Sequence, residues 1–354
     1  MHSHKPARDA RAGLGRPSAR RTRQRTDDSD EMRALLHVLD EHPDEALLQR
    51  ALSHAHYRVL ARAAEAAADG LHYALEPALM TAFGRLAALD HKHDPGCLAK
   101  GAIARALVAL DCLSADFFRQ GIRLRQLEPV WGGRIDTAAD VRATCAMGLA
   151  VSGAADALLD LVDLLVDPEH RVRSGAVRAI ACTEPRAAEA VLRAKALLGD
   201  VEAEVGGECF QALLVVAPDT APAFVGRWLE GAPDADAQLA ELAALALGES
   251  KLDAAVALLR ARWEAEPLRG QRQRVLLRAA ALARTPLALE WLFGLAADAD
   301  TATVQQVIEE LAVHRRQQRI RDALRERLTA RGEPILLSAF DALFATPPAA
   351  RGSE

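Results

Sequence analysis

One pattern constrains this sequence more than any other. A valine or leucine is followed four positions later by a small or aliphatic residue, and the pair recurs about every 33 residues. Residues four apart lie on one face of an α-helix, and a period of this length has room for two helices and two short turns. The copies are Val141/Cys145, Val172/Ala176, Val205/Cys209, Leu239/Ala243, Val275/Ala279 and Val304/Ile308.

The composition favours helices over sheets. Alanine, the best helix former, supplies 75 of the 354 residues, whereas aromatic residues supply only 4%. Prolines fall between the apolar stretches, where they end one helix or begin the next. We expect helix pairs at 73–89/95–110, 114–126/137–151, 154–166/169–182, 186–198/202–216, 219–230/235–247, 251–265/269–283, 285–297/300–312 and 316–330/333–345.

A single pair of this kind exposes its apolar face, and only stacking on a neighbouring pair buries that face. The sequence therefore predicts an all-α fold, an α-solenoid in which about eight antiparallel helical pairs form a right-handed superhelix. We expect four segments. These are a disordered basic tail at 1–30, irregular helical pairs at 31–136, regular repeats at 137–346 and a disordered tail at 347–354.

Several segments resemble bacterial HEAT repeats, especially the HEAT-like type of phycobilin lyases. The resemblance is carried by DVRATCAMGLA (140–150), DPEHRVRSGAVRAIA (167–181), GDVEAEVGGECFQALL (199–214) and LAELAALALGES (239–250). It implies a stack of helical pairs, and such repeats serve mostly as binding scaffolds.

The resemblance also implies an Asp/Arg pair at the start of each second helix. The pair is present as Asp140/Arg142 and, less closely, as Glu169/Arg173. Later copies have no arginine at the matching position, which is occupied by Gly206, Ala240, Leu276 and Gln305. We therefore expect no continuous polar ladder.

Charge argues against a nucleic-acid-binding body. The net charge is −5, and residues 1–29 carry eight basic and three acidic residues, which leaves 36 basic against 46 acidic residues in the remainder. Only the basic tail is a candidate for nucleic acid. No apolar run approaches the roughly 18 residues of a membrane span. Five cysteines without a CxxC pair indicate reduced thiols and a cytoplasmic protein.

No catalytic set is evident, and no cofactor is expected. His91, His93 and Asp94 are candidate metal ligands, although a turn before Pro95 also collects polar surface residues. Diiron hydroxylases built on HEAT repeats bind iron through His-Glu dipeptides, and this sequence contains none. Cys145 and Cys209 occupy the small-residue position of the repeated pair, which predicts buried thiols rather than nucleophiles.

Residues 126–136 depart from the repeat, because this connection takes about ten residues where the others take two to five. We expect a loop that folds back onto the array through a buried Trp131, with Gly132-Gly133 permitting a sharp turn. Arg134 and Asp136 would then face the neighbouring second helices. The segment is either a functional loop or a packing plug.

The favoured function is a non-enzymatic scaffold that binds another protein or peptide on the concave face. Second helices line that face in HEAT arrays, and the expected contacts, together with Trp131, Arg134 and Asp136, are Arg178, Glu208, Gln211, Arg274 and Arg278. The alternative is a HEAT-like enzyme, of the chromophore-lyase type or with another small-molecule site near 126–136. A closed pocket facing that loop would favour the enzyme.

Overall fold

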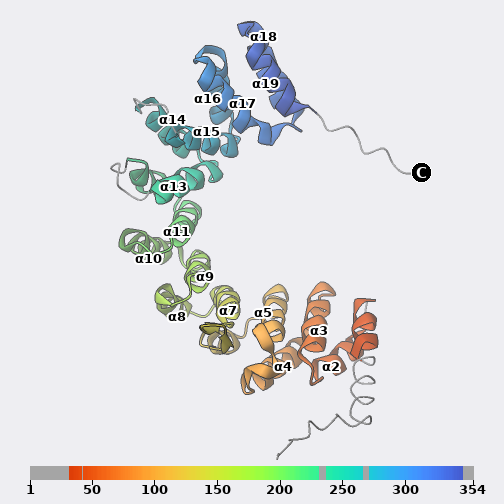
Figure 1. Cartoon of the computed structure of the whole chain (residues 1–354). Coiled ribbons are helices and arrows are strands. Elements are labelled where there is room, and N and C mark those ends of the chain that lie inside the picture. Colours follow the sequence, from red (N-terminus) through yellow and green to blue (C-terminus); the bar gives the residue numbers. More distant parts are fainter. Residues whose placement is uncertain (1–31, 42, 231–236, 266–270, 346–354) are drawn as a thin grey trace, which may run out of the picture. The chain divides into compact units, whose positions relative to one another are not determined.

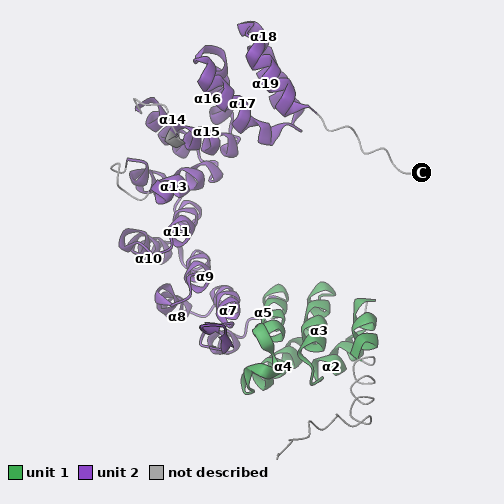
Figure 2. Ribbon diagram, in the orientation of Figure 1, with its two compact units in different colours: residues 1–110 green, residues 111–354 purple. Residues whose placement is uncertain are grey.

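The computed structural model describes residues 32–41, 43–230, 237–265 and 271–345 (Figure 1). The expected tails at 1–30 and 347–354 lie outside the described residues. The chain forms two compact units, residues 1–110 and residues 111–354 (Figure 2).

The first unit contains two helical pairs preceded by a helix over residues 32–40. Helices α2 and α3 pack on one another, as do α4 and α5, and the two pairs are joined through the contacts of α2 with α4 and of α3 with α5. The α2/α3 pair was not among the expected ones. The bounds are α2 Glu45–Leu52, α3 Tyr57–Asp69, η1 Tyr73–Leu75, α4 Glu76–Ala87, η2 His91–His93, η3 Pro95–Cys97 and α5 Leu98–Ala109.

The second unit is a row of helical pairs, each formed by a first helix and a second helix packed against it. The expected pairs from 114 onward are confirmed, with ends that differ by a few residues. The bounds are α6 Ala115–Ile122, α7 Ala139–Val151, α8 Ala157–Asp163, η4 Leu164–Val166, α9 His170–Ile180, α10 Pro185–Leu198, α11 Ala203–Val216, α12 Ala221–Gly226, η5 Arg227–Glu230, α13 Ala237–Glu249, α14 Asp253–Ala265, α15 Gln271–Ala283, α16 Pro286–Asp298, α17 Thr301–Leu311, η6 Ala312–His314, α18 Gln318–Arg331 and α19 Pro334–Phe344.

Successive pairs stack through their second helices. Helix α7 packs on α9, α9 on α11, and the contacts continue through α13, α15 and α17 to α19 (Figure 1). First helices also stack, α12 on α14, α14 on α16 and α16 on α18. Within the described residues, the chain is thus an all-α repeat solenoid apart from two short strands. None of the described helices has the length and apolarity that a membrane crossing requires.

The repeated apolar pair forms the interior of this stack. Val172, Ala176, Val205 and Cys209 are all buried, and so is nearly every other member of the pattern. The small residues serve close helix contacts, since a Cβ added to Gly248 of α13 would lie 2.2 Å from the carbonyl oxygen of Ala279 in α15. The spacing that predicted the fold is therefore the spacing of the helix-to-helix contacts.

Candidate functional site

Residues 126–136 form a β-hairpin rather than the expected loop. Strands β1, Leu127–Val130, and β2, Gly133–Asp136, pair antiparallel, with Leu127 opposite Asp136 and Val130 opposite Gly133. The hairpin connects first helix α6 to second helix α7 in the second unit. Gly132 has φ of 88°, a backbone conformation that glycine adopts without strain, which explains the glycine in the turn.

Trp131 lies at the tip of the hairpin and is fully exposed, with a relative accessibility of 103%. The expectation that Trp131 is buried was wrong, and the hairpin does not fold back through it. Leu127, Val130 and Ile135 are also exposed, so both faces of the two-stranded sheet are open to solvent. The hairpin is held by polar contacts at its base, and these leave its apolar side chains free.

Asp136 fixes that base. One carboxylate oxygen accepts hydrogen bonds from the backbone N–H of Gln126 at 3.1 Å and of Ala138 at 3.0 Å. The other accepts from Nη1 of Arg142 at 2.7 Å. The backbone N–H of Thr137 also donates to the carbonyl oxygen of Gln126 at 2.9 Å. These bonds join the two ends of the hairpin to each other and to helix α7.

Arg142 is fully buried and connects the hairpin to the next repeat. Its Nε and Nη2 donate to the two carboxylate oxygens of Asp167 at 3.2 and 3.0 Å, while Nη1 donates to the carbonyl oxygen of Leu124 at 3.0 Å. Arg125 adds an ion pair to Asp167 at 2.7 Å. Every charge in this cluster has a partner of opposite sign, as burial requires.

The same arrangement recurs one repeat later. Arg173 donates from Nε and Nη2 to Asp200 at 2.8 and 2.7 Å and from Nη1 to the carbonyl oxygen of Asp167 at 2.8 Å. Lys195 also donates to Asp200 at 2.7 Å. Asp136, Asp167 and Asp200 each accept from the backbone N–H two residues further on.

The arginines therefore bond to aspartates in the turns, and not to the acidic residues that precede them at the start of the second helices. Asp140 lies on the surface and pairs with Arg171 at 3.5 Å, not with Arg142. We call the contacts of Arg142 and Arg173 with Asp136, Asp167 and Asp200 the ladder. The ladder stops where Gly206 replaces the next arginine, which agrees with the expectation that it is not continuous.

The electrostatics of the ladder favour ionised carboxylates. Burial by itself would raise the pKa of Asp200, but the hydrogen bonds from Arg173, Lys195 and the backbone of Glu202 outweigh it and hold that pKa well below its usual range. Burial and hydrogen bonds from backbone and arginine compete in the same way at Asp136 and Asp167, and lower the pKa of each. The ladder is therefore a fully charged structural support at neutral pH.

The turns that carry the ladder also expose apolar residues. Val166 precedes the turn into α9, and Leu198 and Val201 flank the turn into α11, all of them largely exposed. These connections and the hairpin all run from a first helix to a second helix, and the Arg142 cluster ties the first of them to the base of the hairpin. We call Trp131, Val166, Leu198 and Val201 the turn edge.

The residues expected as contacts on the second helices each bond to a side chain of a neighbouring second helix. Arg178 forms an ion pair with Glu208 at 2.6 Å, and Gln211 donates to Glu249 at 2.7 Å. Arg274 pairs with Glu309 at 2.7 Å and with Glu310 at 2.9 Å, and Arg278 pairs with Glu310 at 3.1 Å. These bonds run between neighbouring second helices and leave the side chains partly accessible.

His91, His93 and Asp94 lie in the turn that leads into helix α5. His91 and His93 lie in η2, whereas Asp94 is buried, accepts from the backbone N–H of Ala99 at 2.8 Å and pairs with buried Lys100 at 3.0 Å. The carboxylate of Asp94 therefore caps the start of helix α5 and is already bonded to Ala99 and Lys100. Over the ranges that the structure describes, no group of three side chains could hold a metal ion.

The two cysteines of the repeated pair are buried as expected, and burial raises the pKa of the Cys145 and Cys209 thiols to about 12. Such thiols are protonated at neutral pH and are poor nucleophiles.

Two surface pockets lie on first helices, away from the hairpin. One, between α10 and α12, is lined by Arg186, Arg193 and Arg227 around Phe224. The other lies between α14 and α16 and is lined by two tryptophans. Neither is the closed chamber facing residues 126–136 that an enzyme at the hairpin would need.

No protein-family model matches the sequence, and no curated protein matches it significantly. Among solved structures, the chain is similar to the complex of CpcE and CpcF of phycocyanin lyase from Nostoc sp. PCC7120, at 18% identity, with a TM-score of 0.34, over 73% of this chain and 94% of that chain. It is also similar to an engineered protein, at 17% identity, with a TM-score of 0.36, over 86% and 84% of the two chains.

Proposed function

We propose that this protein is a non-enzymatic scaffold that binds another protein or peptide, with the hairpin as its main contact. The observation that carries the proposal is the fully exposed Trp131 at the tip of a hairpin with a buried, charged base. Tryptophan is the residue type most enriched among energetically dominant interface contacts, and exposed apolar clusters mark interaction sites.

The bonds at the base of the hairpin make this contact rigid. Asp136 and Arg142 hold both ends of the hairpin through bonds of 2.7 to 3.1 Å, so the position of Trp131 depends little on partner binding. Binding elements that are already ordered lose less conformational entropy when a partner docks. The buried ladder thus contributes to affinity without touching the partner.

The turn edge extends the surface across three repeats. Val166, Leu198 and Val201 add exposed apolar area in the next two connections from a first helix to a second helix, while Arg134 adds a charge on strand β2. A partner that covers the tip of the hairpin and continues along these turns would bury an apolar centre with a polar rim, as protein interfaces do.

The second helices remain a second proposed contact surface. A partner at Arg178, Glu208, Gln211, Arg274 or Arg278 has to compete with the bonds that these side chains already make, and it would gain specificity more than affinity. The proposed location is the cytoplasm, and in the described residues the cysteines are thiols and not disulfides. A basic tail that binds nucleic acid would lie outside the described residues.

The hairpin also favours the scaffold over a small-molecule enzyme. Ligand sites bury most of the ligand surface in a concavity, whereas the hairpin is open on both faces. A flat, exposed, apolar element suits a second macromolecule.

The test is affinity capture from a lysate of the source organism with three tagged forms of the full chain. These are the wild type, Trp131→Ala, and Val313→Ala as a control that trims another exposed apolar residue. We expect a protein retained by the wild type and by the control and reduced at least about tenfold with Trp131→Ala, as for a dominant interface residue. Equal retention by all three forms would remove the hairpin from the proposal.

A further inference from the structure

The pocket between first helices α14 and α16 contains an unsatisfied buried donor. Trp291 is 6% exposed, and its Nε1 has no hydrogen-bond partner among the described residues. Trp263 of α14 packs against it edge to face, with the two ring centroids 6.1 Å apart and the planes at 74°. A buried N–H without an acceptor costs free energy, so the site lacks one acceptor atom.

The other residues that line the pocket indicate what kind of ligand could bring an acceptor atom to Trp291. Leu287 and Leu295 add apolar walls, and a Cβ added to Gly294 would meet nothing within 4 Å, so the pocket is open at that point. Its volume is about 620 Å³, within the usual range of ligand pockets.

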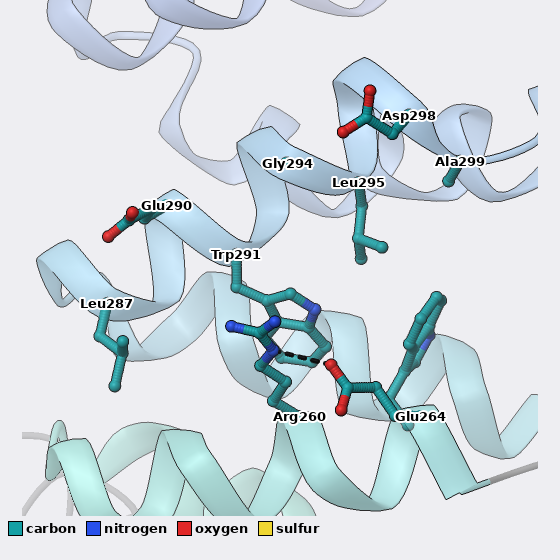
Figure 3. Close-up of a pocket in the computed structure, with 10 residues that line it drawn as sticks. Arg260, Glu264, Leu287, Glu290, Trp291, Gly294, Leu295, Asp298 and Ala299 are labelled. Carbon is teal, nitrogen blue, oxygen red and sulfur yellow. Dashed lines mark hydrogen bonds and ion pairs between the residues drawn. The ribbon is translucent and has the colours of Figure 1, made fainter.

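The charge of the lining selects a cation. Among the described residues that line the pocket, Glu264, Glu290 and Asp298 oppose one positive charge, that of Arg260, which pairs with Glu264 at 2.8 Å. Glu290 and Asp298 are exposed lining residues whose side chains extend from α16 away from the ring of Trp291 (Figure 3), and we call their two carboxylates the rim. Tryptophan faces attract cations, and carboxylates at a rim raise the local concentration of positively charged ligands.

We propose that this pocket binds a lysine or arginine residue of an extended peptide. Such a residue combines the three features that the lining calls for. Its main-chain carbonyl accepts from Nε1 of Trp291, its aliphatic stem packs on the indoles and leucines, and its charged end reaches the carboxylate rim. A simple amine has the charge and lacks the carbonyl, and an acidic residue would be repelled. The site lies on first helices and is independent of the hairpin surface.

The experiment is a titration of the full chain, labelled with nitrogen-15, with acetyl-Gly-Lys-Gly-amide, followed by NMR of the indole N–H signals. Trp291→Phe identifies the signal of Trp291. The comparison ligands are the neutral acetyl-Gly-Gln-Gly-amide, of similar size, and n-butylammonium, which has the cation without the carbonyl. We expect the lysine peptide to shift the Trp291 signal and to bind more tightly than both.

The variants separate the contributions. Trp291→Phe removes the donor and part of the aromatic surface and is expected to weaken binding about fivefold to tenfold, whereas Trp228→Phe, a tryptophan outside this pocket, leaves it unchanged. Glu290→Gln with Asp298→Asn changes only exposed charges and is expected to weaken binding about twofold to fivefold with an unchanged melting temperature. If Trp291→Phe is unstable, the double variant Glu290→Gln with Asp298→Asn tests the proposal in its place.

Two results would overturn the proposal. One is equal binding of the lysine and glutamine peptides. The other is a Trp291 signal that does not respond to the lysine peptide. Either result leaves the hairpin proposal intact, because that proposal depends on Trp131.

Discussion

Arg142 in α7 and Asp167 in the turn before α9 hold two successive repeats together through two hydrogen bonds to the same carboxylate, of 3.2 Å from Nε and 3.0 Å from Nη2. Both side chains are almost completely buried. The guanidinium also holds Asp136 at the base of the hairpin, so one residue fixes both the stacking of the repeats and the position of the exposed contact element. The stacking of the repeats and the position of the proposed binding surface therefore both depend on the buried cluster of Arg142, Asp136 and Asp167.

Replacing Arg142 tests this centre. Arg142→Met keeps much of the side-chain volume but leaves Asp136 and Asp167 buried with fewer positive partners. We expect a loss of roughly 3–5 kcal/mol in the free energy of unfolding, measured by urea denaturation. Arg171→Met, which removes an exposed ion pair with Asp140, is the control and should cost less than about 1 kcal/mol. Similar costs for both would mean that the buried cluster contributes no more than a surface pair.

The lowered pKa of Asp200 predicts how stability depends on pH. Because the folded pKa lies below the unfolded value of about 3.9, the carboxylate stabilises the fold fully above that value. That contribution is lost as pH falls from about 4 toward the folded pKa, since protonation weakens the bonds from Arg173 and Lys195. Urea midpoints measured from pH 6 to pH 3 should fall less steeply in Asp200→Asn than in the wild type. Asp140→Asn, on the surface, should keep the wild-type slope, and a steep slope in Asp200→Asn would assign the acid sensitivity elsewhere.

Ala243 tests the helix contacts. It is fully buried in α13, so Ala243→Asp places an unpaired charge between helices, and we expect a cost above about 3 kcal/mol. The matched change Ala257→Asp, at an exposed position of α14, adds only the lower helix propensity of aspartate, which costs less than about 1 kcal/mol. Thermal melts of both variants by circular dichroism provide the comparison. If Ala243→Asp melts with the wild type, the position is not a helix contact.

The helices could be predicted because their signal is local and repeated. Each second helix from α7 onward has apolar residues four apart, and the same spacing recurs in every repeat, so in this part of the chain the expected helices differ from the structure only at their ends. The α2/α3 pair lies outside this regular spacing and was not expected. The hairpin could not be predicted in this way. Its strands have four residues each, one contains Pro129, and neither faces a core, so no alternation of buried and exposed residues marks them.

The contacts between the arginines and the aspartates have a signal in the sequence. Asp136, Asp167 and Asp200 are separated by 31 and 33 residues, the same spacings as the first two intervals of the apolar pair. The HEAT resemblance points to Arg142 and Arg173 but not to these aspartates, because it groups each arginine with an acidic residue near it in sequence. An arginine side chain is long enough to reach the next repeat, and in a stack of repeats that repeat is the nearest neighbour.

Trp131 provides the last prediction, because the sequence and the structure lead to opposite outcomes. A buried tryptophan would contribute roughly 2–3 kcal/mol, so its removal would lower the melting temperature by several degrees. Trp131 is fully exposed, and the hairpin is held by Asp136 and Arg142 instead. We therefore expect Trp131→Ala to melt within about 1 °C of the wild type, because replacing an exposed side chain that makes no buried contact changes the free energy of unfolding little.

Fluorescence gives an independent measure of the same exposure. The wild-type emission should contain a red-shifted component that iodide quenches, and Trp131→Ala should lose that component while the emission of buried Trp291 persists. A blue-shifted component that disappears together with a lower melting temperature would instead show that the indole packs against the array. In that case the rigid, exposed contact on which the scaffold proposal depends would not exist. The two measurements use the same variant and need no partner, so they can precede the search for one.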